Sequence, residues 1–108
     1  QGADFAVWID ELHQSLGNPL LVEVKAGDVT ASRLDDAAEQ LRYYIGRTHG
    51  RSGLLVYWGR QNREYPALDP RWPLVIRLSF PRLSKLVAQD RLVEELIRLR
   101  NAAVHGKG

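Results

Sequence analysis

The chain has 108 residues, enough for one domain whose core needs no disulfide or metal in order to fold. It has no cysteine, which excludes a disulfide scaffold, a thiolate zinc site and a cysteine nucleophile. Hydrophobic residues make up 44% and charged residues 26%, the balance of a globular protein. No apolar run approaches the roughly 18 residues of a membrane span, so we expect a cytoplasmic protein.

Basic and acidic residues are unevenly distributed along the chain. The first 50 residues carry four basic and eight acidic side chains, whereas residues 51–108 carry eleven basic and five acidic ones. Such a division is typical of a metal site next to a polyanion and, more commonly, of a surface with many ion pairs. The chain also has no methionine and begins at Gln1, so we expect it to be a piece of a larger protein.

Two strands and a helix are expected first. Polarity alternates over residues 4–10, and residues 20–26 form an apolar run that ends at Gly27. Turn residues between the two runs predict an antiparallel hairpin. The helix follows, with Ser32 as the expected N-cap and Gly46 as the expected stop.

Two more strands and a helical segment complete the expected order. Residues 53–59 are continuously apolar, which predicts a buried central strand with Trp58 in the core. Residues 60–72 form a polar loop and residues 73–78 a further strand, and the pattern is helical from Pro81 onward, as one helix or two. The order predicts a mixed α/β fold, and it permits a parallel crossover between the second and third strands.

Charged residues interrupt the second strand. Glu23 and Lys25 lie two residues apart and share one face, where they must be paired or bind a metal. If Asp4 faces either of them across the hairpin, the three side chains converge; if it faces Val24, they do not. The carboxylates of Asp4 and Glu23, with the backbone carbonyl of Val24, form an all-oxygen site for Mg²⁺ or Mn²⁺. Lys25 beside it stabilises negative charge on a phosphate. The alternative is a buried Glu23–Lys25 ion pair with Asp4 as an edge residue.

Further polar residues lie on the helix and in the long loop. Gln40 and Tyr44 are four residues apart at the border of the apolar helical stripe, and Arg47 follows on the same side. An amide, a phenol and a guanidinium in line can hold a phosphate backbone, or they can form the half-buried edge of any amphipathic helix. Arg60 and Arg63 are candidates for contacts with the DNA backbone, or else part of a solvated loop.

In their order along the chain, these residues resemble the PD-(D/E)xK nuclease superfamily, and most of all its Mrr-type and RecB-type branches. The resemblance covers about residues 2–59 and implies a restriction endonuclease-like core, with a central mixed sheet flanked by helices. It implies that Tyr44 contacts DNA and that Asp4 and Glu23 ligate Mg²⁺. The catalytic residues that it implies are Asp4, Glu23, Lys25 and Gln40.

The chain departs from the family pattern at its start. Members begin with a helix and a strand before the aspartate-bearing strand, and neither precedes Asp4 here, while Ala3 replaces the usual proline. We therefore expect the N-terminal helix and first strand to be missing, which leaves an open sheet edge or an uncovered apolar face. An absent N-terminal segment or another chain, including a second copy in a homodimer, is expected to complete the fold.

The C-terminal stretch offers a different candidate. Residues 100–105 resemble the Arg-polar-x-x-x-His motif of HEPN ribonucleases, which implies metal-independent RNA cleavage by Arg100 and His105. The alternative, which so short a match favours, is a helix end with both side chains near the negative end of the helix dipole.

Together, the sequence predicts a nuclease core over residues 1–80, truncated at its N-terminus, with a helical segment over residues 81–108 packed on it. The expected function is that of a Mg²⁺- or Mn²⁺-dependent DNA endonuclease, which hydrolyses phosphodiester bonds with a metal-bound water. Two alternatives stay open. One is a catalytically inactive DNA- or protein-binding module of the same fold, and the other is a HEPN-like ribonuclease fragment.

Overall fold

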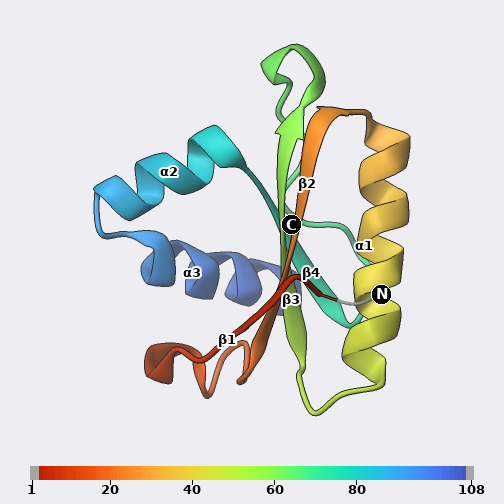
Figure 1. The fold of residues 1–108 in the computed structure, drawn as a ribbon. Helices are drawn as coiled ribbons and strands as arrows, with labels where there is room; N and C mark the ends of the chain where they lie inside the picture. Colours follow the sequence, from red (N-terminus) through yellow and green to blue (C-terminus); the bar gives the residue numbers. More distant parts are fainter. Residues whose placement is uncertain (1–2, 107–108) are drawn as a thin grey trace.

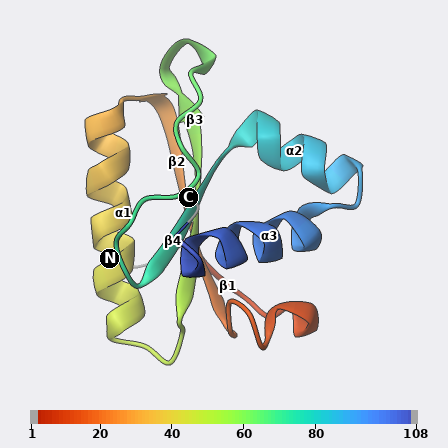
Figure 2. The ribbon, with the colours of Figure 1, turned by 180° about the vertical axis from the view of Figure 1, so that it is seen from behind.

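The computed structural model describes residues 3–106 as a four-stranded mixed sheet between helices (Figures 1 and 2). Helix α1 covers one face of the sheet, and α2 and α3 cover the other. The elements are β1 (Phe5–Val7), β2 (Leu20–Val29), α1 (Ala31–Gly46), β3 (Ser52–Gly59), β4 (Leu74–Ser79), α2 (Phe80–Ala88) and α3 (Leu92–Val104), with short 3-10 turns η1 (Asp10–Leu12) and η2 (Arg60–Asn62). The expected α/β class is confirmed. Within residues 3–106, no helix is long and apolar enough to cross a membrane.

The sheet order is β1-β2-β3-β4, with β1 antiparallel to β2 and the other neighbours parallel. Strand β1 is shorter than the expected 4–10, because the Asn18 side chain bonds both the N–H and the C=O of Ile9 (3.0 and 3.1 Å) and ends the ladder. Strand β2 is longer than expected. It continues through Gly27 and Asp28, whose φ values of 76° and 37° accompany an irregular stretch of pairing with β3.

Two local expectations need correction, the N-cap of α1 and the burial of Trp58, and the number of C-terminal helices, which the sequence left open, is two. The N-cap of α1 is Thr30 rather than Ser32, because the Thr30 hydroxyl accepts the N–H of Arg33 (3.2 Å) directly after β2 ends. The C-terminal segment forms two helices, separated at Asp90, where φ is 55°. Trp58 is not in the core: it is 45% exposed and stacks on Phe80 with ring centroids 4.7 Å apart.

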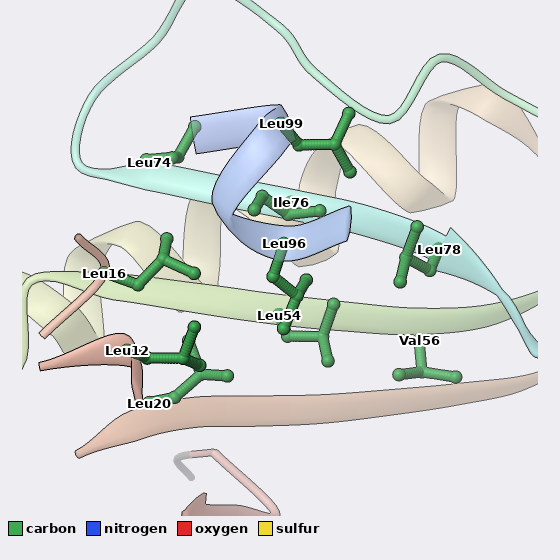
Figure 3. Close-up of a cluster of buried hydrophobic side chains, with 10 residues drawn as sticks. All are labelled: Leu12, Leu16, Leu20, Leu54, Val56, Leu74, Ile76, Leu78, Leu96 and Leu99. Atoms are coloured by element: carbon green, nitrogen blue, oxygen red, sulfur yellow. The ribbon is translucent and has the colours of Figure 1, made fainter. Parts of the chain in front are cut away.

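Each face of the sheet has its own apolar core. Figure 3 shows the core under α3, where Leu96 and Leu99 of the helix lie close to Leu54 of β3 and Ile76 of β4. Because this core is shared, the C-terminal helices and the sheet fold as one unit. The buried residues under α1 are Leu21, Val29, Leu34, Ala37, Ala38, Leu41, Ile45, Leu55, Tyr57 and Val75.

The loop between η2 and β4 is clamped to α1 by buried charges. Arg42 of α1 is 5% exposed and donates to Asp69 (2.5 Å) and to the carbonyl of Pro73 (3.1 Å). Arg77 of β4 is 6% exposed and donates to Asp35 of α1 (2.9 Å). Buried arginines are tolerated because each finds a carboxylate and a carbonyl. The clamp therefore fixes how α1 lies against the sheet.

Asp69 is the central carboxylate of this clamp. Its burial alone would raise its pKa, but the hydrogen bond from Arg42, the N–H of Arg71 and the charges of both arginines outweigh that effect. The pKa of Asp69 is therefore lowered below its ordinary value of 3.8.

We expect Asp69→Asn to lower the free energy of unfolding by about 3 kcal/mol, because it leaves buried arginine charge without its partner. Urea denaturation measures this change. Glu94→Gln is the matched control, since Glu94 is 70% exposed and pairs with Arg91 at 3.5 Å, and it should cost less than about 0.5 kcal/mol. Equal effects of the two substitutions would contradict a stabilising clamp.

The same variant predicts a pH dependence. A carboxylate whose pKa is lowered on folding stabilises the folded state fully above its unfolded pKa, which for Asp69 is about 3.8. That stabilisation is lost as the pH falls through the lower, folded pKa. The difference in unfolding free energy between the wild type and Asp69→Asn should therefore be constant above about pH 5 and shrink below about pH 4. A difference that grows on acidification would contradict this assignment.

One apolar area of the sheet is uncovered, on the face opposite α1. Phe5 and Val24 are 58% and 43% exposed, and Phe5 lies directly across from Val22. Strand β1 is also the edge of the sheet, as Figure 1 shows. An open edge with an uncovered apolar face is what we expected from the sequence. The segment or chain that covers it stays a prediction.

Candidate active site

The first carboxylate of the candidate site is held at the edge of β2. Phe5 and Val22 form the last described pair of β1 and β2, and Asp4 directly precedes Phe5. The N–H of Val24 donates to Asp4 Oδ2 at 2.8 Å, which fixes the carboxylate beside the second strand. This is the register in which the three charged side chains converge, because a slip of one residue would turn Asp4 to the other face.

Glu23 and Lys25 lie on the face of β2 that α1 covers. Their side chains form an ion pair, with Glu23 Oε2 3.3 Å from Lys25 Nζ, and they are 15% and 37% exposed. The ion pair of the alternative interpretation is therefore present, although Lys25 is not buried.

The backbone of Val24 faces the same open edge. The N–H and C=O of one strand residue point to the same side, and the N–H of Val24 points to Asp4. Among the described residues, the pairing of β1 with β2 ends at Phe5 and Val22, so Val24 lies just beyond it. A donor set of the Val24 carbonyl, Asp4 and Glu23 is what we predicted for a hard cation such as Mg²⁺ or Mn²⁺.

Only two carboxylates belong to this set. Within the described part of the chain, no three His, Cys, Asp or Glu side chains gather in a way that could hold a metal ion. The Mg²⁺ or Mn²⁺ site that we predicted therefore depends on the Val24 carbonyl and on water or substrate oxygens for its remaining ligands. Such incomplete coordination by protein is common for Mg²⁺, which keeps several waters.

Helix α1 lines the site from the other side. Three adjoining hollows run along the boundary between α1 and the edge strands, with volumes of about 230, 420 and 170 Å³. The hollow of 230 Å³ is lined by Asp4 and Tyr44. The hollow of 420 Å³ is lined by Glu23, Gln40 and Tyr44, and that of 170 Å³ by Lys25 and Gln40. The structure thus brings Gln40 and Tyr44 to the three charged residues of the hairpin, as the helical spacing predicted.

The candidate arginines lie outside this centre. Arg47 follows the end of α1, where it donates to the Tyr43 hydroxyl (2.7 Å) and lies 5.5 Å from the centroid of the Tyr43 ring. Arg60 and Arg63 lie beyond the carboxyl end of β3, where the loop turns back so closely that a Cβ on Gly59 would lie 1.9 Å from the Arg63 carbonyl oxygen. Arg47 therefore lies at one end of the boundary between α1 and the strands, and Arg60 and Arg63 lie at the other. The structure does not bring the three arginines together.

Three residues along the hollows escaped sequence reasoning. Tyr43 lines the largest hollow, and Arg33 and Asp36 line the smallest. The signal was present, because Arg33, Gln40 and Tyr44 repeat at the spacing of one helical face. It was hidden because the helix presents its apolar core stripe beside this polar edge.

The alternative site of the C-terminal stretch lies on the other face of the sheet. Arg100 belongs to α3, its guanidinium donates to the Asn101 side chain (3.1 Å), and exposed His105 follows the helix as its C-cap. Leu96 and Leu99 of α3 are buried in the core of that face. A structural role of α3 is therefore evident, and RNA cleavage by Arg100 and His105 stays a prediction.

Two substitutions at Asp4 separate its hydrogen bond to Val24 from its predicted role as a metal ligand. Asp4→Asn keeps an oxygen that accepts the N–H of Val24 but removes the charge, whereas Asp4→Ala removes both. We expect Asp4→Asn to weaken Mn²⁺ binding by at least about 10-fold with little loss of stability, and Asp4→Ala to impair both. Calorimetric titration with Mn²⁺ and thermal unfolding measure the two effects. Asp10→Asn, at an exposed position of η1, is the control; wild-type affinity in Asp4→Asn would exclude Asp4 as a ligand.

Comparisons with protein-family models, with curated proteins and with solved structures found no match. The class of the fold therefore comes from the structure itself: a compact α/β domain with a four-stranded mixed sheet and three helices. The chemical interpretation of the site comes from the residues that the β1–β2 register and α1 bring together.

Proposed function

We propose that the chain carries the active centre of a metal-dependent DNA endonuclease with a restriction endonuclease-like core. The observation that carries the proposal is the convergence of Asp4, Glu23 and Lys25 at one edge of β2, under the Gln40–Tyr44 face of α1. Their common location along one boundary supports the PD-(D/E)xK resemblance.

The connectivity supports the same proposal. An antiparallel pair, β1 and β2, is followed by a helical crossover through α1 to the parallel strand β3. The antiparallel pair places Asp4 beside Glu23, and the crossover returns α1 over the face that carries Glu23 and Lys25. This order of elements is the one on which the motif was expected.

The chain's own residues divide the chemistry among them. Asp4, Glu23 and the Val24 carbonyl would hold a divalent cation, which supplies an activated water and neutralises charge on the phosphate. Lys25 lies 3.3 Å from Glu23. It holds a positive charge, or a proton, where negative charge develops on a phosphate oxygen. Gln40 and Tyr44 keep the DNA strand against the carboxylates, with a neutral amide and phenol that do not compete with the cation.

The salt bridge between Glu23 and Lys25 also fits an inactive binding module, in which it would only stabilise β2. The two hypotheses differ because a nuclease needs the metal ion and Lys25 for its activity, whereas a binding module needs neither. An ion pair at a partly exposed edge is worth little to stability, about 0–1 kcal/mol, so its removal should leave the fold intact. Activity assays on folded variants can therefore separate the two readings.

The test is nicking of plasmid DNA with Mg²⁺ or Mn²⁺. Lys25→Ala should leave Mn²⁺ binding largely intact and lower cleavage by about two to four orders of magnitude, the scale of one lost electrostatic or proton-transfer group. Glu23→Ala should lose metal binding and cleavage together. Lys85→Ala, at an exposed lysine of α2, is the matched control and should cleave like the wild type.

EDTA and His105→Ala identify the competing functions. The proposal requires cleavage to stop in EDTA and to persist in His105→Ala. Cleavage of RNA that survives EDTA and Lys25→Ala but fails in His105→Ala would move the active site to α3. Binding of DNA without any cleavage, under every metal tested, would favour the inactive module.

A further inference from the structure

The largest hollow beside the candidate active site has walls that suit a flat aromatic ligand. It has a volume of about 420 Å³, within the range of about 300–1,000 Å³ that is usual for small-molecule sites. Its lining combines apolar Ala37 and Leu41 with the rings of Tyr43 and Tyr44 and the amide of Gln40. Aromatic walls with a few polar groups are what a nucleobase site requires, because the base stacks on a ring and pairs with an amide.

The electrostatics of the hollow also suit a nucleotide. Its two carboxylates are compensated, since Glu39 pairs with Arg42 (3.0 Å) and Arg71 (3.4 Å), and Glu23 pairs with Lys25. A base that enters the hollow therefore does not bring its phosphate against unpaired negative charge.

One lining residue of the hollow, Tyr43, contacts an arginine. Arg47 lies 5.5 Å from the centroid of the Tyr43 ring and donates to the Tyr43 hydroxyl (2.7 Å). The two contacts hold the ring, which is 66% exposed, in a defined place. They also hold beside the ring a guanidinium, a group that binds phosphates well. Tyr43 thus offers a stacking surface, and Arg47 a phosphate contact, on one side of the site.

We propose that this hollow binds a single unpaired nucleobase, so that the strand held at the active centre is single-stranded DNA. The inference rests on the proposed nuclease function and specifies its substrate class. The hollow is lined by residues of α1 and by Glu23 of β2, and a base can lie flat against the exposed Tyr43 ring only after it has left the duplex stack. The base stacks on Tyr43, its edge pairs with Gln40, and its phosphate lies between Arg47 and the Glu23–Lys25 pair.

A thermodynamic cycle tests the base contact directly. The complete chain, in EDTA so that metal-dependent cleavage cannot occur, is titrated with a fluorescent single-stranded oligodeoxynucleotide and with versions that lack one base at successive positions. Tyr43→Ala should weaken binding of the intact strand about 5- to 150-fold, which corresponds to a base–aromatic stacking energy of about 1–3 kcal/mol. One abasic position should cause a similar loss, and that loss should disappear when Tyr43→Ala is also present.

Two controls define the alternatives. Trp8→Ala removes an aromatic side chain that is 69% exposed and lines none of the three hollows, and it should leave binding unchanged. Duplex DNA should bind Tyr43→Ala as it binds the parent protein. If Tyr43→Ala weakens the binding of duplex and single-stranded DNA equally, Tyr43 contacts the backbone and not a base. If the affinity losses from Tyr43→Ala and from the abasic position simply add, no base contacts Tyr43. Either result overturns the inference.

The outcome is separable from that of the nuclease proposal. Plasmid nicking without coupling between Tyr43→Ala and any abasic position would leave the nuclease standing and end the base-pocket inference. Coupling in a protein that never cleaves DNA would support the base pocket and contradict the nuclease.

Discussion

The hydrogen bond from the Val24 N–H to Asp4 Oδ2 is the contact on which the candidate site depends. It lies beyond the last paired residues of β1 and β2, so it extends the hairpin by a side chain where the backbone ladder has ended. Without it, no described contact would hold the Asp4 carboxylate at β2. With it, one carboxylate oxygen is fixed at Val24, the strand residue between Glu23 and Lys25.

A second constraint holds the other wall of the site. Gln40, Tyr43 and Tyr44 can face β2 only if α1 keeps its rotation and height against the sheet. Apolar packing largely fixes the rotation and height of α1, but packing alone tolerates small shifts of the helix. The ion pair between Arg42 and Asp69 tolerates less, because its hydrogen bonds form in a narrow range of positions. The buried clamp therefore supports the site, and Arg42 also pairs with Glu39 at the wall of the largest hollow.

Much of this arrangement could be predicted from the sequence, because the signals were local. Three signals reflect contacts within one or two elements: the polarity of residues 20–26, the i, i+4 spacing of Gln40 and Tyr44, and the hairpin turn. The N-cap at Thr30 and the exposure of Trp58 could not be predicted, since both depend on where neighbouring elements end. The clamp was also missed, because its arginines join residues that are 27 and 42 positions apart. Tyr43 was missed because its role depends on a hollow that only the assembled sheet and helix create.

The most direct test of the central claim is the anomalous scattering of Mn²⁺ in crystals of the protein. The account predicts one strong peak at the edge of β2, ligated by Asp4, Glu23 and the Val24 carbonyl, with Lys25 beside it. An edge of β2 without Mn²⁺, in crystals where the Glu23–Lys25 ion pair persists at saturating metal, would contradict the account and leave a charged but purely structural pair.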